Sequence, residues 1–195
     1  MDFALLRDAF WGLTFDGLAL GAIYALISLG YTLVYGVLRL INFAHSEVFM
    51  IGTFSALVAS GIMGVKIEDD PRTGWGMIFT LLICLIAAMI ASAVTAVLVE
   101  IIAYRRLRQR GATKLATLIS AIGVSISLVE AFRILTDSLP REFPRIMDKT
   151  FLFSYAGADV RNDKVIVIIA AGLMMFALER FISKSRYGNG IRAVS

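Results

Sequence analysis

The chain has 195 residues, of which 58% are hydrophobic and 17% are charged, and its mean hydropathy is +0.80. A soluble domain is usually about 45–50% apolar with roughly a quarter of its residues charged, so this composition excludes an ordinary soluble domain. The net charge of +4 indicates basic loops of a membrane protein rather than nucleic-acid binding, because no basic face alternates with aromatic residues.

The first predicted membrane segment covers residues from about 10 to 38. Within it, Gly17–Leu38 contains no charged residue. As a helix this stretch would span about 33 Å, which is enough for a bilayer core of roughly 30 Å. Asp16 stands just before the uncharged stretch, so we expect the part buried in lipid to begin at Gly17.

A polar break at residues 39–47 separates the first segment from a second one at about 48–65. The break contains Asn42, His45 and Glu47. Polar side chains near membrane depth are costly and often mark a pathway, which makes these three residues candidates for a translocation path. The alternative is that they cap the second helix, with Asn42 or Ser46 at its start and Glu47 in the first turn.

Three further segments follow, at about 75–102, 115–135 and 165–182. The connection after the third segment carries only basic charges, whereas the long loop at 136–164 carries equal numbers of acids and bases. Pro140 and Pro144 argue against a continuous helix in that loop. Glu130 and Arg133 lie three residues apart near the end of the fourth segment and are expected to form an ion pair.

The fold class predicted from this pattern is all-α: a polytopic transmembrane helical bundle in which residues 1–195 form one transmembrane domain. The dense basic cluster after the third segment is expected on the cytoplasmic side. Counting crossings from it places the N-terminus outside the membrane and the tail at 183–195 inside. The basic residues of the cluster are Arg105, Arg106, Arg108, Arg110 and Lys114.

Residues for catalysis or metal binding are scarce. Cys84 and His45 are the only residues of their kinds, which makes a zinc or haem site unexpected. The sequence contains neither a phosphate-binding P-loop nor a nucleophile elbow nor a zinc-protease motif. We therefore expect no enzyme activity, no bound cofactor and no metal in this chain.

Several motifs resemble the membrane subunit of branched-chain amino-acid ABC importers, and more narrowly the H-type permease of the high-affinity system. The first set surrounds the polar break: GAIYAL from Gly21, GYTLVYG from Gly30, INFAHSE from Ile41 and MIG from Met50. The family usually has glycine where this chain has Ser46. That departure removes glycine's conformational freedom from the turn but keeps the polar side chains.

Two more regions carry the same resemblance. The connection between the third and fourth segments contains Glu100, then AYRRLR from Ala103 and IGVS from Ile122. The family commonly has proline at Arg106 and Gln-Asn near Glu130. The last residues, SRYGNGIRAV from Ser185, are similar to the start of a cytoplasmic coupling loop.

The resemblance implies a multi-pass permease of the bacterial inner membrane. Its implied partners are a sister permease, cytoplasmic ABC ATPase subunits that hydrolyse ATP, a periplasmic amino-acid-binding protein and the lipid bilayer, with no nucleic acid. It also implies roughly eight membrane segments, so we expect this chain to be truncated at its C-terminus. The implied ATPase-coupling residues are Tyr187, Gly188, Ile191 and Arg192.

Other functions remain open on the sequence alone. A urea- or amide-type ABC permease of the same superfamily shares the motif around the polar break. A non-transporting membrane fragment or scaffold would use the same apolar segments. A channel or ion-coupled carrier would need charges inside the membrane. Apart from Asp16, Glu100, Glu179 and Arg180 near segment ends, the predicted segments contain only the charges of the Glu130–Arg133 pair.

Overall fold

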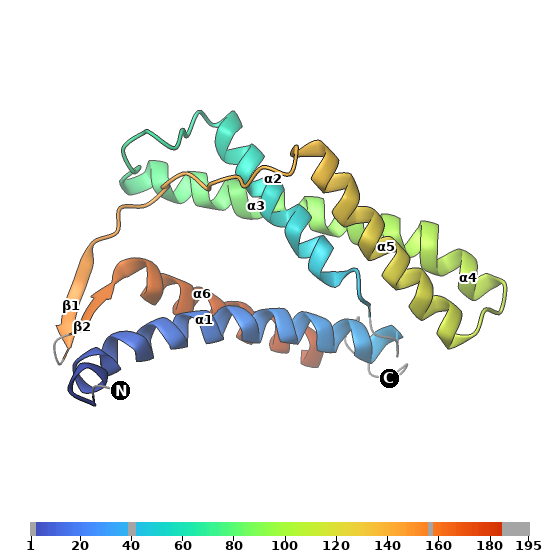
Figure 1. Cartoon of the computed structure of the whole chain (residues 1–195), viewed down its shortest axis with the longest axis horizontal. Coiled ribbons are helices and arrows are strands. Elements are labelled where there is room, and N and C mark those ends of the chain that lie inside the picture. The colour runs from blue at the N-terminus through green and yellow to red at the C-terminus, as the bar shows by residue number, and fades with distance from the viewer. Residues whose placement is uncertain (1–2, 39–41, 156–157, 185–195) are drawn as a thin grey trace. The chain divides into compact units, whose positions relative to one another are not determined.

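A computed structural model describes residues 3–38, 42–155 and 158–184 of the chain (Figure 1). The chain forms two compact units. Unit 1 comprises Met1–Arg39 and Lys149–Ser195, and unit 2 comprises Leu40–Asp148.

Five helices in the described part of the chain are long and apolar enough to cross a membrane. This confirms the predicted fold class, an all-α polytopic transmembrane bundle. The five spans are Phe10–Gly36, His45–Ile62, Gly74–Gln109, Leu115–Leu135 and Asn162–Lys184.

Unit 1 is built from two long helices and a small hairpin. Helix α1 (Phe3–Leu38) contacts α6 (Asn162–Lys184), and strands β1 (Phe151–Tyr155) and β2 (Ala158–Arg161) precede α6. The two helices run in the same direction. Asp16 of α1 meets Lys164 near the start of α6, while Leu29 lines the same small pocket as Glu179 further along.

The antiparallel hairpin occupies the end of the long loop that the sequence analysis left without regular structure. Its strands have only five and four residues, and their register shifts between Phe151 and Phe153, so the alternation that signals a strand is weak. Beyond β2, the Asn162 side chain accepts a hydrogen bond from the Asp163 backbone N–H at 2.8 Å. Helix α6 begins at Asn162, three residues before the start of the predicted segment.

Unit 2 contains α2 (His45–Ile62), α3 (Gly74–Val99), the π-helix η1 (Glu100–Arg105), the short α4 (Arg106–Gln109) and α5 (Lys114–Leu135). Helices α3, η1 and α4 follow one another without a break, so the helix that contains the predicted segment at 75–102 continues through the arginines to Gln109. Helix α2 begins and ends three residues earlier than the predicted segment. It starts at His45, and Gly64, with a φ of +71°, stands just beyond its end.

Helices α2 and α3 pack antiparallel. Near the start of α2, a Cβ placed on Gly52 would collide with the Ser92 Oγ of α3, so the two backbones approach closely there. Near its end, Ala59 packs against Cys84, and Ile146 from the loop after α5 completes this buried cluster. Small residues at such crossings allow the close approach that membrane helices use for packing.

Helix α5 runs alongside α2 in the same direction. Its start is capped by Thr113, whose Oγ1 accepts from the Ala116 N–H at 3.3 Å. Further along, Phe132 of α5 packs against Phe54 of α2 with ring centroids 5.1 Å apart and the ring planes tilted by 57°. The predicted pair forms on this helix, with the Arg133 Nε 2.8 Å from the Glu130 Oε2.

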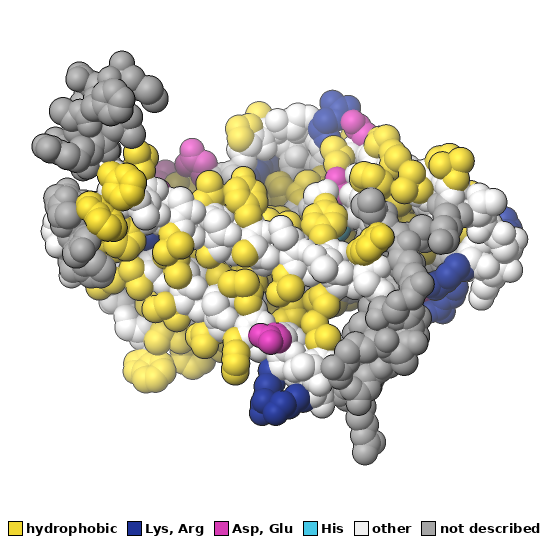
Figure 2. All heavy atoms as spheres, turned by 90° about the horizontal axis from the view of Figure 1, so that it is seen from below, with side chains coloured by type: hydrophobic (Ala, Val, Ile, Leu, Met, Phe, Trp, Pro, Cys, Tyr) yellow, Lys and Arg dark blue, Asp and Glu magenta, His cyan; other side chains and the backbone are white. Residues whose placement is uncertain are grey.

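The surface of the described residues is strongly apolar. Large side chains such as Ile62 (82% exposed), Trp75 (76%) and Leu135 (75%) face outward. Apolar side chains cover much of the face that Figure 2 shows, with charged groups isolated among them. Water would oppose such a surface and lipid would favour it, in line with the five spans.

Candidate functional site

The start of α2 carries a cluster of polar groups, here called the polar joint: Asn42, His45, Ser46 and Glu47, together with Tyr104 of η1. The Tyr104 hydroxyl donates to the Asn42 Oδ1 at 2.6 Å. The same oxygen accepts from the Ala44 backbone N–H at 3.1 Å. Asn42 therefore connects the segment before α2 to the third span, 62 residues away in the sequence.

Two of the three path candidates lie in the first turn of α2. Glu47 is buried, with 8% of its surface exposed, and its Oε2 accepts from the Ser46 hydroxyl at 2.9 Å. A carboxylate in the first turn of a helix is stabilised by the helix dipole. His45, the first residue of α2, is partly buried beside it.

The hydrogen bonds at the start of α2 can be compared with the alternative that these residues cap the helix. Ala44 occupies the N-cap position and makes no side-chain cap. The Asn42 oxygen bonds the N–H of Ala44 itself rather than one inside the helix, and the Ser46 hydroxyl donates to Glu47. Only Glu47 therefore has the position that the capping interpretation gave it, because it lies in the first turn of α2.

The π-helix η1 explains how Tyr104 reaches Asn42. In a π-helix each N–H bonds to the carbonyl five residues earlier, so the side chains are rotated relative to an α-helix. Tyr104 is 6% exposed and packs with Val99 and with Ala121 of α5. The sequence analysis included Tyr104 in a family motif but assigned it no role, because its partner is distant in the sequence.

The same π-turn organises charge beside the joint. Residues five apart share a face of a π-helix, and the Arg105 Nη2 lies 3.1 Å from the Glu100 Oε2. The Arg108 guanidinium pairs with the other oxygen of the same carboxylate. Glu100 thus holds two of the arginines in the basic cluster.

A second contact fixes α2 just beyond the joint. The Ser92 hydroxyl of α3 donates to the Val48 carbonyl at 3.1 Å, one turn from the close approach at Gly52. At the far end of α2, the Arg72 guanidinium donates to the Met63 carbonyl at 2.8 Å and to the Thr80 Oγ1 at 3.0 Å. The Thr80 side chain is fully buried. Both ends of α2 are therefore tied to α3 or to its extension.

An apolar groove of about 630 Å³ opens between α2, the third span and α5. Two of the hydroxyls in its lining are already bonded to their own helices, Thr95 to the Ala91 carbonyl and Ser127 to the Gly123 carbonyl. The lining residues from the third span and α2 are Ile51, Thr95, Leu98, Val99, Ile102 and Ala103. Those from α5 are Ser120, Gly123, Val124, Ser127 and Leu128.

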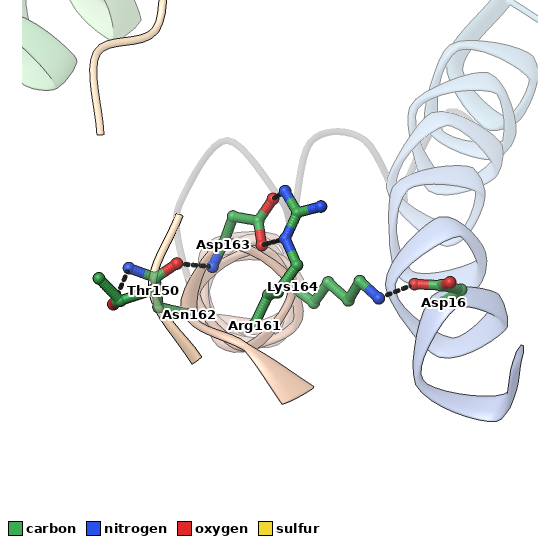
Figure 3. Close-up of polar contacts among 6 residues, drawn as sticks. All are labelled: Asp16, Thr150, Arg161, Asn162, Asp163 and Lys164. Atoms are coloured by element: carbon green, nitrogen blue, oxygen red, sulfur yellow. Dashed lines mark hydrogen bonds and ion pairs between the residues drawn. The ribbon is translucent and has the colours of Figure 1, made fainter. Parts of the chain in front are cut away.

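In unit 1, charged side chains gather where the hairpin meets α6 (Figure 3). Lys164 extends from α6 to pair with Asp16 on α1. Arg161 and Asp163 form a two-bonded pair at 3.1 and 2.6 Å. Helix α1 continues through Asp16 without a break, and the expectation that the part buried in lipid begins at Gly17 stays a prediction. The partner of Asp16 stands 148 positions later, which no local pattern in the sequence reveals.

The candidate coupling residues Tyr187, Gly188, Ile191 and Arg192 lie outside the described residues. The described part of the chain contains no group of three or more His, Cys, Asp or Glu side chains that could hold a metal ion.

Comparison with known proteins gives a consistent result over nearly the whole chain. Residues 13–195 match the family described as the permease component of branched-chain amino acid transport systems. The permease BraD of the high-affinity branched-chain amino acid transport system of Pseudomonas aeruginosa is 36% identical over 181 residues, or 91% of this chain and 56% of BraD.

LivH permeases of the corresponding high-affinity systems give similar matches. LivH of Escherichia coli K12 is 34% identical and that of Salmonella typhimurium 35% identical, each over 183 residues, or 92% of this chain and 56% of the relative. The chain thus spans about half the length of the curated relatives it matches. No solved structure gives a significant match. The extent of these matches shows that the chain belongs to the family of permease components of branched-chain amino acid transport systems.

Proposed function

We propose that the chain is a membrane permease subunit of an ATP-binding-cassette importer for branched-chain amino acids. The family match over residues 13–195 supports this, as do the names of the relatives, each a high-affinity branched-chain amino acid permease. The five apolar helices are long enough to supply membrane-spanning segments of such a subunit. ATP would be hydrolysed by separate cytoplasmic subunits, with a sister permease and a periplasmic binding protein completing the assembly.

The observation that carries the proposal is the polar joint at the start of an apolar membrane span. Glu47 is buried at the start of a membrane span, and ionisable residues in such positions are usually functional. An amino acid substrate carries an ammonium and a carboxylate. In this proposal Glu47 receives the ammonium, while Asn42 and His45 offer hydrogen-bonding groups along the path.

The resemblance alone assigns Tyr187, Gly188, Ile191 and Arg192 to contact with the ATPase subunit.

In the same proposal the N-terminus lies outside the membrane and the C-terminal tail lies in the cytoplasm. Helices α1 and α6 run parallel, which supports the proposal that both cross the membrane in the same direction. The basic cluster after the third span supports its cytoplasmic placement.

The transport proposal is tested by uptake of labelled leucine into proteoliposomes that contain the assembled importer and its binding protein. We expect uptake that needs ATP on the cytoplasmic side and that isoleucine and valine inhibit, whereas urea does not. Uptake that persists without ATP, or that urea inhibits, would contradict the proposal.

The path assignment is tested by Glu47→Gln in the same assembly. Loss of the negative charge is expected to raise the KM for leucine about tenfold or to lower kcat by a similar factor, because a charge-assisted bond is removed. Thr53→Ala, on the exposed side of the same helix, is the matched control and should leave both constants unchanged. Equal kinetics for Glu47→Gln and the control would remove Glu47 from the path.

The coupling assignment is tested by co-purification with the ATPase subunit. Arg192→Glu should release that subunit, whereas Lys184→Gln, at the end of α6, should retain it. Retention of the ATPase by Arg192→Glu, together with normal leucine-stimulated hydrolysis, would refute this role.

A further inference from the structure

The arginines after the third span fall into two groups with different partners. Residues 100–113 contain four arginines and one glutamate, a formal charge of +3. Arg105 and Arg108 share the carboxylate of Glu100. Arg106 and Arg110 are exposed, and no carboxylate among the described residues lies within ion-pair distance of either.

The spacing of the third span connects these two arginines to the apolar groove. Leu98 and Ile102 line the groove, and Arg106 and Arg110 follow at the same four-residue interval. Side chains four apart lie on the same face of an α-helix, and in the wider π-turn at Glu100–Arg105 an interval of four is still close to one turn. The face that lines the groove therefore continues toward two arginines that have no ion-pair partner among the described residues.

We propose that this face binds an anionic phospholipid. The guanidinium groups of Arg106 and Arg110 hold its phosphate, and an acyl chain lies in the groove between the third span and α5. Arginine forks match phosphate oxygens in geometry and in charge. The groove volume of about 630 Å³ falls within the usual range of ligand sites, roughly 300–1,000 Å³.

Charge complementarity favours a lipid over a helix of another subunit in this groove. A helix of another subunit would fill the apolar groove, but it would also need an acidic side chain at the level of Arg106 and Arg110. A phospholipid provides an apolar tail and an anionic headgroup in this order, at the depth where a membrane span ends. The bonded hydroxyls of Thr95 and Ser127 leave the lining suited to hydrocarbon.

Native mass spectrometry of the purified full chain, with any subunits that co-purify, tests the headgroup contact. Phosphatidylglycerol is titrated against phosphatidylcholine with the same acyl chains. The Arg106→Gln/Arg110→Gln variant should lose the preference for phosphatidylglycerol by roughly 25-fold, since each basic residue near an anionic lipid contributes about fivefold. The control Arg141→Gln/Arg145→Gln removes the same charge from two exposed arginines and should keep the preference. An equal loss in both variants, or no loss in either, would overturn the proposal.

A second variant tests the acyl-chain contact. Gly123 lines the groove, and a Cβ built on it has no neighbouring side chain or other helix within 4 Å, so Gly123→Leu places a larger side chain in the groove. It should lower retention of phosphatidylglycerol about tenfold, whereas Gly172→Leu, equally free of neighbours on α6, should not. If Gly123→Leu leaves lipid retention intact and instead releases a co-purifying membrane subunit, the groove belongs to a helix and the proposal is wrong.

Discussion

Units 1 and 2 differ in the kind of contact that joins their neighbouring helices. In unit 2, side chains bond to fixed backbone or buried positions: Arg72 to the Met63 carbonyl, Ser92 to the Val48 carbonyl and Tyr104 to Asn42. In unit 1, α1 and α6 are joined by the Asp16–Lys164 ion pair, whose aspartate is 55% exposed. A short hydrogen bond between buried groups forms only when the two helices have one relative position. An exposed ion pair can form in several relative positions.

This difference has a functional consequence. Helix α2 carries the path candidates His45 and Glu47, and the unit 2 contacts fix its position at several points along its length. If the Glu47 carboxylate and the Asn42 amide bind the substrate together, contacts that fix α2 would keep the two groups correctly placed. The variants below test whether the contacts of unit 2 are energetically stronger than the ion pair of unit 1.

The largest effect is expected at the crossing of α2 and α3. In Gly52→Leu the new side chain collides with the Ser92 Oγ, and overpacking of this kind costs about 1–3 kcal/mol or more. Thermal unfolding in detergent should show a large loss of stability. Gly61→Leu on the same helix has open space and serves as the control. In the milder Gly52→Ala, adding Ser92→Ala should restore much of the loss, and failure to do so would show that the crossing is not the cause.

The next effect is expected at the far end of α2. Arg72→Gln removes two bonds from a guanidinium and leaves the Met63 carbonyl without this donor. Bonds to charged groups contribute roughly 1.5–3 kcal/mol, so a loss of about 2 kcal/mol is expected in the same unfolding assay. The exposed Arg141→Gln is the control. Equal stability of the two variants would mean that Arg72 does not tie α2 to α3.

A smaller effect is expected at the polar joint. Tyr104→Phe keeps the buried ring but removes the hydroxyl that donates to Asn42. Because Asn42 still accepts from the Ala44 N–H, the expected cost is about 1 kcal/mol. Tyr24→Phe, at an exposed tyrosine of α1, should be neutral. A Tyr104→Phe protein as stable as this control would show that the bond contributes nothing to the fold.

The smallest effect is expected from the ion pair of unit 1. Lys164→Asp places two carboxylates together, and the swap Asp16→Lys/Lys164→Asp restores opposite charges. Exposed pairs contribute roughly 0.2–1 kcal/mol, so the coupling measured by the double-mutant cycle should lie in that range. A coupling free energy larger than the cost of Tyr104→Phe would mean that the ion pair of unit 1 is stronger than this contact of unit 2, contrary to the comparison above.

Hydropathy was sufficient to predict the five spans, because an uncharged stretch of about 20 residues has few alternatives to a membrane helix. It failed where a partner distant in sequence decides the structure. Asp16 pairs with Lys164, 148 positions later, and Tyr104 bonds to Asn42, 62 positions earlier. The hairpin before α6 has short strands, although the aromatic run from Phe151 to Tyr155 is a signal for strand that was available.

The candidate site could be predicted only in part. The sequence singled out Asn42, His45 and Glu47 through their position in a polar break, and the structure places all three in the polar joint. The π-turn that orients Tyr104 has no signature in hydropathy or motif spacing. Tyr104 and Val99 pack against Ala121 of α5, a contact that a single sequence does not reveal.

The most direct test of the account is leucine uptake by the assembled importer carrying Asn42→Ala, Tyr104→Phe or both. If the hydroxyl of Tyr104 positions Asn42 on the path, each single variant should slow uptake about three- to tenfold, and the double variant should be no slower than Asn42→Ala, because both changes remove one interaction. Unchanged uptake in Asn42→Ala, or losses that multiply in the double variant, would contradict the role assigned to the polar joint.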